Sequence, residues 1–185
     1  MLVLASKSPR RRELLSLIAE NFETDTAQNG EESFTGGEVS EYVMRLARAK
    51  AEEVSPRHAG DVILSADTVV ALGGRVLGKP RSEADAFRML KSLSGRAHEV
   101  FTGVCVIGRK KTVCDFVRTE VVFRELSDEE ITAYIKTGEP LDKAGAYGIQ
   151  GGAGKFASAV NGDYFNVIGL PMKRVYEILS GEEKE

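Results

Sequence analysis

The chain has 185 residues, of which 42% are hydrophobic, and a formal net charge of -3. This length and composition predict one well-cored domain, residues 1–185, that folds without disulfide or metal staples. The slightly acidic balance disfavours a protein that coats nucleic acid, so any phosphate contact is expected to be local. No apolar run approaches the ~20 residues needed to span a bilayer, and no basic region precedes the short apolar start. We therefore expect a cytoplasmic protein that binds neither nucleic acid nor membrane.

The first predicted strand, residues 2–5, is followed at once by a helix start. Ser8, which precedes a proline, suits the N-cap position. Arg10, Arg11 and the next residue, also arginine, fall in the first turn, where the helix dipole disfavours cations. The strand, the short turn with Ser6 and Ser8, and the helix N-terminus therefore favour a phosphate or carboxylate site. The alternative is a solvated basic patch.

A second strand is expected at residues 22–26, followed by a polar, glycine-containing segment with the composition of a loop over a site. Residues 38–54 then predict an amphipathic helix. With about 3.6 residues per turn, Lys50 falls in the middle of the buried stripe of this helix. Lys50 either snorkels to the surface or projects into a cleft, and its position alone leaves both open.

Residues 62–72 are β-branched and apolar and predict a strand, with Gly73 and Gly74 as the turn into a short return strand. Asp67 lies in the middle of this strand. Carboxylates are depleted from strands, and a buried one is costly unless it is paired or bound to a cation. Asp67 is therefore either a structural residue that closes the strand or bonds a loop, or a working group. Lys79, just past the return strand, brings positive charge back toward it.

The next elements are predicted to be structural. Ser82 with Asp85 resembles a capping box and opens a core-facing helix. Residues 97–107 and 112–123 alternate well enough to predict two long antiparallel strands. Of the two histidines, one stands at the start of the first of these strands and is expected to be a hydrogen-bonded structural residue. The other, His58, is expected to be a surface loop residue.

The two cysteines lie symmetrically about residues 109–110. If this dipeptide is a two-residue hairpin loop, Cys105 lies opposite Cys114, close enough for a disulfide. Reduced core cysteines are favoured for a cytosolic chain. The spacing of the two does not match a metal-binding motif.

The C-terminal third begins with another capping box, Ser127 to Glu130, which opens a helix. Residues 139–155 form a long, glycine-dense stretch typical of a loop that approaches a ligand closely. Residues 156–160 are predicted as a strand and residues 171–179 as a closing helix.

Known site motifs are mostly excluded. Residues 148–155 resemble a phosphate-binding P-loop only superficially, because Phe156 stands where the metal-binding hydroxyl is needed. A nucleophile elbow, a zinc signature and a dinucleotide fingerprint are also missing. A set of cations with two carboxylates remains, and such a set suits a polyphosphate with a divalent metal. Its members are Arg10, Arg11, Lys50, Lys79, Glu31 and Asp67.

Seven ordered blocks, running from the first strand to the last helix, carry a resemblance to a known family. They are LASKSPRRRELL at 4–15, YVMRLARAKA at 42–51, SADT at 65–68, LGKP at 77–80, LSGR at 93–96, DKAGAYGIQG at 142–151 and GDYFNVIGLP at 162–171. These blocks resemble the Maf family of nucleoside triphosphate pyrophosphatases. The resemblance implies an α/β fold with a long twisted mixed β-sheet flanked by helices. It also implies two lobes with a cleft, similar to the inosine triphosphate pyrophosphatases, the Ham1-like proteins.

The resemblance also implies an activity. A Maf protein of this kind hydrolyses a nucleoside triphosphate to the monophosphate and pyrophosphate, with Mg or Mn as its divalent metal cation. A homodimer is the expected assembly. The alternative from another class is a nucleotide-binding regulator of septum formation or cell division, which binds its ligand without turning it over.

Roles for the acidic residues follow from the resemblance. Asp67 matches the catalytic carboxylate, which either activates the attacking water or holds the metal that does so. Glu31 matches the loop acid that is the second metal-linked carboxylate. The usual run of several acids is shorter here, so Glu32 is the alternative.

The cationic and hydroxyl residues match in the same way. Arg11, Lys50 and Lys79 resemble the triphosphate clamp, with both lysines in the catalytic set, and Ser6 and Ser8 line the same turn.

Three further positions separate branches of the family. Arg10, Thr68 and Gln150 match the branch similar to dTTP/UTP pyrophosphatases rather than the branch acting on 7-methyl-GTP. The expected substrates are dTTP, UTP and modified pyrimidine nucleotides. A glutamine amide offers both a donor and an acceptor to a uracil edge.

Overall fold

The computed structural model of the chain describes residues 1–29 and 32–183. Its strands are β1 (Leu2–Ala5), β2 (Glu23–Asp25), β3 (Val62–Leu72), β4 (Arg75–Leu77), β5 (Ala97–Ile107), β6 (Thr112–Phe123) and β7 (Ala157–Asn161). Its helices are α1 (Pro9–Ser16), α2 (Val39–Val54), α3 (Glu83–Leu93), α4 (Asp128–Ile135), α5 (Tyr164–Ile168) and α6 (Met172–Glu183). Short 3-10 turns are η1 (Ser55–Arg57), η2 (Glu139–Asp142), η3 (Ala144–Ala146) and η4 (Gly152–Phe156). Within the described residues, none of the helices combines the length and apolar character needed to cross a membrane.

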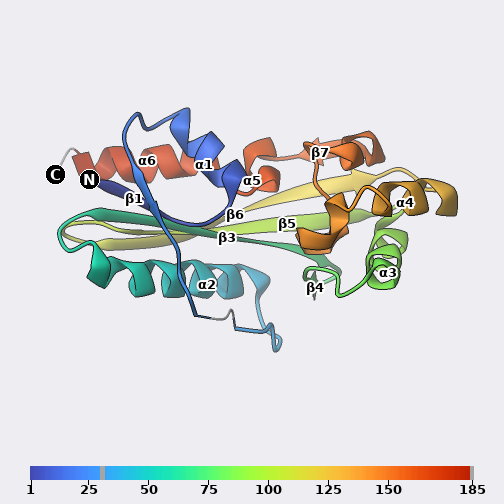
Figure 1. Cartoon of the computed structure of the whole chain (residues 1–185), viewed down its shortest axis with the longest axis horizontal. Coiled ribbons are helices and arrows are strands. Elements are labelled where there is room, and N and C mark those ends of the chain that lie inside the picture. The colour runs from blue at the N-terminus through green and yellow to red at the C-terminus, as the bar shows by residue number, and fades with distance from the viewer. Residues whose placement is uncertain (30–31, 184–185) are drawn as a thin grey trace.

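The strands form one mixed sheet in the order β2-β1-β3-β5-β6-β7, with β4 also paired to β3. The pairs β1–β2 and β1–β3 are parallel, whereas β3–β5, β5–β6 and β6–β7 are antiparallel. Figure 1 shows how far the three longest strands extend across the molecule and how strongly the sheet twists. The predicted long, twisted mixed sheet is thereby confirmed.

Two strands share one edge of β3. β1 pairs with residues 62–64 and β4 with residues 70–72, while β5 covers residues 63–71 on the opposite edge. In the described part of the chain, residues 65–69 consequently have no neighbouring strand on the edge shared by β1 and β4. Asp67 and Thr68 both lie in this gap, and as consecutive strand residues they point to opposite faces of the sheet.

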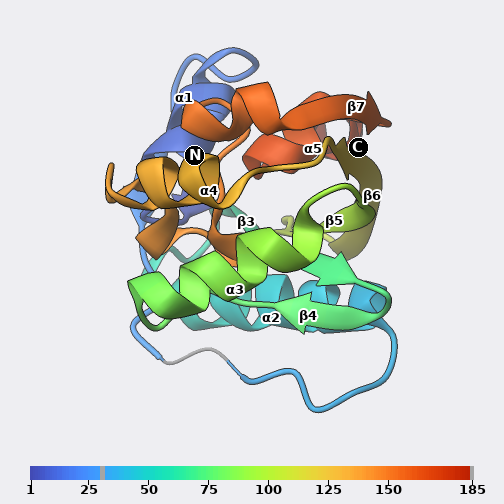
Figure 2. The ribbon, with the colours of Figure 1, turned by 90° about the vertical axis from the view of Figure 1, so that its right-hand side faces the viewer.

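Helices cover both faces of the sheet. α2 packs along one face, where its Val43, Ala47 and Ala51 are fully buried. α1 and α6 cover the other face, while α3 and α4 lie toward the far end of the sheet (Figures 1 and 2). Burying a side chain such as that of Val43 stabilises the fold by roughly 1.5–3 kcal/mol. This burial holds α2 against the sheet.

A glycine brings α2 unusually close to the sheet. Gly103 of β5 lies directly across from Asp67. A Cβ atom at this position would be 2.3 Å from the carbonyl oxygen of Val43 in α2. Because glycine has no Cβ, the helix backbone packs directly on the strand beside Asp67.

Most of the predicted elements are confirmed. Ser8 caps α1 through its hydroxyl, which accepts from Arg11 N at 3.5 Å. Gly73 and Gly74 form the turn between β3 and β4, and the β5–β6 hairpin closes with a hydrogen bond from Gly108 N to Lys111 O. The register then pairs the two cysteines, and both are free thiols, as favoured from the sequence.

Several details differ from the sequence prediction. Ser82 accepts a hydrogen bond from Asp85 N, but the Asp85 carboxylate accepts from Arg81 N rather than from Ser82, so the predicted capping box is only half formed. Phe156 belongs to η4 and β7 begins one residue later. His58 is half-buried and its Nε2 lies 3.0 Å from Asp25 Oδ2, so it is not a simple surface residue.

Candidate active site

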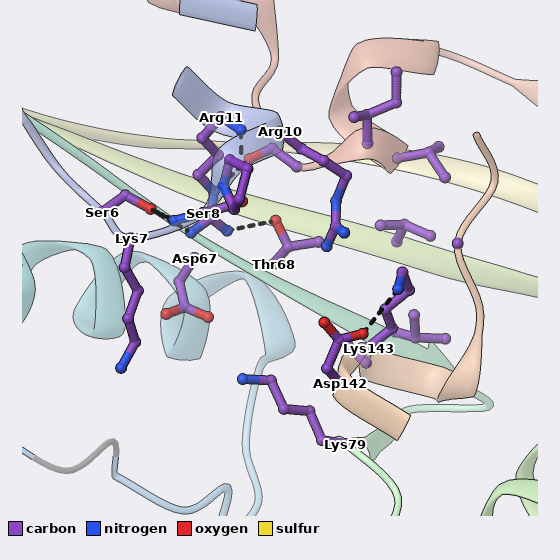
Figure 3. A pocket seen from close by; sticks show the side chains of 18 of the residues that line it. Ser6, Lys7, Ser8, Arg10, Arg11, Asp67, Thr68, Lys79, Asp142 and Lys143 are labelled. Carbon is purple, nitrogen blue, oxygen red and sulfur yellow. Dashed lines mark hydrogen bonds and ion pairs between the residues drawn. The ribbon is translucent and has the colours of Figure 1, made fainter. Parts of the chain in front are cut away.

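A cavity of about 910 Å³ opens at the gap in the edge of β3. The turn between β1 and α1 forms one side and the stretch from η2 to residue 151 forms the other. In Figure 3 the labelled side chains from these segments extend toward a common space. Six cationic and three acidic side chains among the described residues line it, which favours an anionic ligand. They are Lys7, Arg10, Arg11, Lys50, Lys79 and Lys143, with Asp67, Glu139 and Asp142.

The sheet wall of the cavity, defined by Lys50 and Asp67, holds a buried ion pair. Asp67 is only 5% exposed, and the Lys50 ammonium donates to its Oδ2. A buried carboxylate is costly without such a partner, so Lys50 compensates the charge of Asp67. Both residues line the cavity, which means that Lys50 projects into a cleft rather than snorkelling to solvent.

On the other face of the sheet, Arg11 joins three segments. Its Nε donates to Gly169 O at 2.8 Å and its Nη2 to Thr68 Oγ1 at 3.1 Å, while Nη1 reaches Ser6 Oγ at 3.5 Å. Thr68 Oγ1 also lies 2.8 Å from Thr102 Oγ1. Arg11 therefore fixes the turn between β1 and α1 against the strand that carries Asp67.

Other cations of the cavity are less constrained. Within the described residues, Lys79, Arg10 and Lys7 have neither a hydrogen-bond nor an ion-pair partner on their side chains. In Figure 3, Lys7 and Lys79 extend toward the part of the cavity that holds the Asp67 carboxylate. Lys7 and Lys79 are exposed and Arg10 is half-buried, and all three are available to a ligand that carries several negative charges.

The turn wall of the cavity, residues 139–152, is built from 3-10 turns and glycines. Lys143 donates to Asp142 Oδ1 at 2.8 Å, and this bond holds the pKa of the Asp142 carboxyl below its usual value. Gln150 is exposed at the rim. Behind it, the Tyr147 hydroxyl lies 2.8 Å from Nε2 of His98, whose pKa burial lowers to about 4. His98 is therefore the structural histidine that the sequence predicted.

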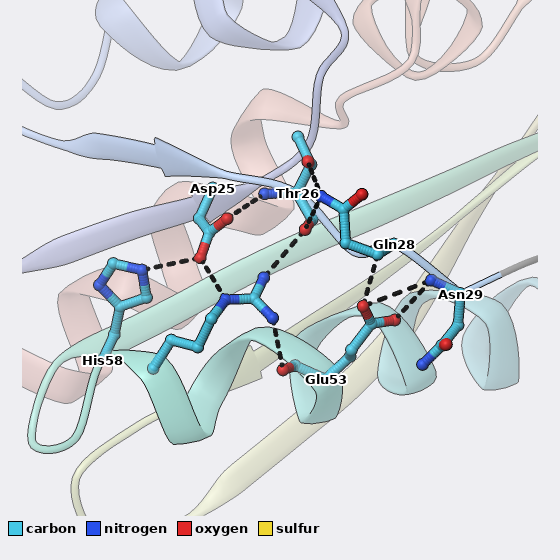
Figure 4. A network of polar contacts seen from close by, with 7 residues as sticks. Asp25, Thr26, Gln28, Asn29, Glu53 and His58 are labelled. Carbon is cyan, nitrogen blue, oxygen red and sulfur yellow. Dashed lines mark hydrogen bonds and ion pairs between the residues drawn. The ribbon is translucent and has the colours of Figure 1, made fainter.

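A polar network anchors the segment that follows β2. Glu53 of α2 accepts hydrogen bonds from the backbone N–H groups of Gln28 and Asn29, which both line the cavity. Arg57 donates to Asp25 Oδ2 at 2.7 Å, and this bond holds the pKa of Asp25 well below its usual range. As Figure 4 shows, α2 and the segment after β2 are thereby tied together at the side of the cavity.

The structure brings together every candidate residue that it describes. Ser6, Ser8, Arg10, Arg11, Lys50, Asp67, Thr68, Lys79 and Gln150 all line the cavity. Glu31, the predicted second acid, lies outside the described residues. Its alternative, Glu32, is exposed, and its carboxylate pairs with Arg45 at 3.3 Å rather than lining the cavity.

A family model described as Maf-like protein matches residues 1–182 of the chain. The chain belongs to the Maf family. The resemblance inferred from the seven sequence blocks is thereby confirmed.

Several curated Maf relatives match this chain over nearly their full length. A protein of Thermococcus gammatolerans named dTTP/UTP pyrophosphatase is 55% identical over 178 residues, covering 96% of this chain and 95% of its own. A protein of Bacillus cereus with the same name is 48% identical over 174 residues, covering 94% of this chain and 91% of its own.

Among solved structures, this Maf chain is similar to the Ham1 protein of Staphylococcus aureus. The TM-score is 0.56 and each chain is covered to 98%, at 14% sequence identity. At this identity the likeness concerns the fold alone, and it confirms the expected Ham1-like fold.

Sequence reasoning missed part of this Maf cavity. Lys7 and Lys143 line it, although neither was singled out beforehand. Lys143 lies inside the sequence block at residues 142–151 that carried the family resemblance, so position within the block was an available signal. Glu139 gave no signal, because its role depends on contacts with residues far along the chain.

Proposed function

We propose that this protein hydrolyses dTTP and UTP to the nucleoside monophosphate and pyrophosphate. The observation that carries the proposal is a buried, lysine-paired carboxylate, Asp67, facing a cavity in which cations outnumber acids. The cavity's volume of about 910 Å³ lies within the usual range of small-molecule sites, and a nucleoside triphosphate is the size of ligand such sites take. Relatives that are 48–55% identical over nearly the full chain and are named for this activity support the choice of substrate.

Asp67 is the group that activates water in this proposal. Its carboxylate accepts the proton of a water molecule that attacks the α-phosphorus, and the bond from that phosphorus to the bridging oxygen breaks. Lys50 holds Oδ2 of Asp67, which fixes the orientation of the carboxylate. Low solvent access strengthens this electrostatic interaction relative to water.

The leaving pyrophosphate needs charge compensation. Lys79, which is free of internal ion pairs among the described residues, binds the β- and γ-phosphates and stabilises the negative charge that develops on the leaving group. Arg11 contributes its guanidinium from a fixed position, because Gly169 and Thr68 already hold it. Ser6 and Ser8 form the turn around the same phosphates.

The base lies against the turn wall in this proposal. Gln150 offers its amide to the uracil or thymine edge. Thr68 and Arg10 complete the set that distinguishes this branch of the family. We therefore expect 7-methyl-GTP, which carries a purine base, to be a poor substrate.

A divalent metal fits the site. Among the described residues, no three acidic, histidine or cysteine side chains form a ready-made metal cluster. Mg²⁺ is nevertheless commonly held by one or two carboxylates together with substrate phosphates. Asp67 would supply one carboxylate and Glu31 the other, and Mg or Mn bound there would neutralise charge on the phosphate oxygens.

The test is a panel of nucleoside triphosphates assayed for pyrophosphate release with Mg²⁺ and with EDTA. The expected result is release from dTTP and UTP in preference to ATP, GTP and 7-methyl-GTP, with orthophosphate forming only after inorganic pyrophosphatase is added. Equal turnover of purine nucleotides contradicts the proposed substrate. Tight binding of UTP without turnover would instead favour the non-catalytic regulator.

A further inference from the structure

Two residues outside the proposed chemistry converge on the segment that carries Gln150. Tyr134 of α4 is 3% exposed, and its hydroxyl donates to Glu139 Oε1 at 2.9 Å. Burial raises the pKa of Tyr134, so the phenol keeps the proton that it donates. The ring is held edge-on against Phe156, with centroids 5.3 Å apart. The pair therefore forms a fixed support behind the turn wall.

This pair holds both ends of residues 148–152, which we call the glycine turn. The Gly148 N–H donates to Tyr134 Oη at 3.1 Å, and the Gly152 N–H donates to Glu139 Oε2 at 3.0 Å. Gln150 lies midway between these two fixed points. Gln150 is exposed and lines the cavity, so its place there depends on the backbone of the glycine turn.

The glycines of the turn allow it to pack closely against the same two side chains. A Cβ atom on Gly151 would lie 2.1 Å from Glu139 Oε1. One on Gly152 would lie 3.1 Å from the Tyr134 ring. The turn thus wraps closely around the Glu139 carboxylate, and any larger residue would displace one or the other. A carboxylate that satisfies two donors in this way leaves the turn little freedom to shift.

We propose that Tyr134 and Glu139 are positioning residues that place the Gln150 amide against the pyrimidine base and so set nucleotide affinity. This inference rests on the proposed function, because it assumes that Gln150 meets the base. The two residues act through the glycine turn and do not touch the phosphates. Their loss should therefore weaken nucleotide binding while the hydrolysis step, which depends on Asp67 and Lys79, continues.

The test is a double-mutant cycle on nucleotide binding. The ligand is the α,β-imido analogue of UTP, in which an NH group replaces the bridging oxygen, and its Kd is measured by calorimetry. Tyr134→Phe removes only the hydroxyl and is expected to weaken binding about tenfold, as is Gln150→Ala. Because both act through the same contact, the double variant should bind no more weakly than Gln150→Ala alone. With UTP as substrate, KM for Tyr134→Phe should rise about tenfold while kcat changes less than about threefold.

Matched variants separate positioning from general damage. Tyr176→Phe makes the same change at a tyrosine of α6 that is 58% exposed and should leave binding unchanged. Glu139→Gln keeps a carbonyl acceptor for Gly152 and should retain most of the affinity that Glu139→Ala loses. If Tyr134→Phe melts at a much lower temperature, the comparison of Glu139→Gln with Glu139→Ala decides in its place.

The outcomes distinguish this inference from the proposed function. Independent, multiplying losses in the double variant, or wild-type affinity in Tyr134→Phe, would overturn the positioning role even if the wild-type protein hydrolyses UTP. Equal affinities of Glu139→Gln and Glu139→Ala would do the same. Wild-type protein that fails to bind the analogue contradicts both the inference and the proposed function.

Discussion

The sheet wall and the turn wall face each other across one cavity but are built in different ways. The sheet wall takes Lys50 from a long helix and Asp67 from the middle of a long strand, and the ion pair between them fixes both side chains. The turn wall consists of 3-10 turns and glycines whose N–H groups donate hydrogen bonds to Tyr134 and Glu139. Groups on regular elements are held to tighter geometry than groups on loops. The difference suggests that the chemistry resides on the sheet wall and the choice of base on the turn wall.

The largest expected effect is the loss of the sheet-wall carboxylate. Asp67→Asn keeps the shape of the side chain but removes its negative charge, so pyrophosphate release from UTP should fall by about 10³-fold or more. The far-ultraviolet circular dichroism spectrum should stay unchanged. Asp128→Asn, at an exposed acid of α4, serves as the matched control. Retained turnover in Asp67→Asn would contradict the role of the Asp67 carboxylate in hydrolysis.

Lys79 tests whether a solvated cation at the cavity contributes to catalysis without supporting the fold. Lys79→Met should lower kcat/KM for UTP by about 10²-fold, because a charge that stabilises the leaving pyrophosphate is lost. Its free energy of unfolding should change by less than about 0.5 kcal/mol, since the residue is exposed. Lys136→Met, an exposed lysine after α4, should change neither quantity. Equal activities of the two variants would contradict the role of Lys79.

Low pH should destabilise the fold through His98, which contacts Tyr147 in the turn wall. Burial keeps His98 neutral when folded, with a pKa of about 4 against an ordinary value of 6.5. Between these pH values the unfolded chain binds a proton that the folded chain does not. The free energy of unfolding is therefore highest above about pH 6.5 and decreases as the pH falls toward 4. Urea unfolding at pH 7.5 and 4.5 should differ by about 2–3 kcal/mol more in the wild type than in His98→Gln. An identical pH dependence in the two proteins would rule out this linkage.

Gly103 tests whether the close packing of α2 on β5 supports the sheet wall. Gly103→Ala places a Cβ against the Val43 carbonyl and forces α2 away from β5, which should destabilise the fold by about 1–3 kcal/mol. Because α2 carries Lys50, UTP turnover should fall as well. Gly181→Ala in α6, where a Cβ meets nothing within 4 Å, should instead stabilise slightly. Unfolding midpoints of the two variants give the test, and a Gly103→Ala protein as stable as the wild type would argue against the close approach.

Local patterns in the sequence were sufficient to predict the helix and strands around the sheet wall. The alternation in residues 97–123 gave both long strands and the loop at residues 109–110, and with them the register that pairs the cysteines. Helical periodicity placed Lys50 on the inner side of α2, where it meets Asp67. In each case the information lies within one element or one hairpin.

The features that sequence reasoning could not reach are non-local. The gap in the edge of β3 arises because β1 and β4, which are far apart in the chain, pair with its two ends. No periodicity within β3 reveals this arrangement. The bonds of Arg11 to Gly169 and of Glu139 to Gly152 depend in the same way on the completed fold. The turn wall was therefore recognisable only as a glycine-rich loop.

The short helix α5 has boundary signals in the sequence that the predicted elements do not include. Asp163 caps its start through hydrogen bonds from Phe165 N and Asn166 N, and Gly169 follows its end. An aspartate and a glycine at this spacing are typical helix boundaries. These signals place Gly169 at the end of a helix. Its carbonyl oxygen accepts a hydrogen bond from Arg11, and the residue lines the cavity.

The most direct test of the central claim follows the oxygen of the attacking water. UTP is hydrolysed in ¹⁸O-labelled water with Mg²⁺, and both products are analysed by mass spectrometry after a single turnover. Attack on the α-phosphorus places the label in UMP and leaves the pyrophosphate unlabelled. Label in pyrophosphate, or formation of UDP and orthophosphate, would contradict this assignment of the chemistry.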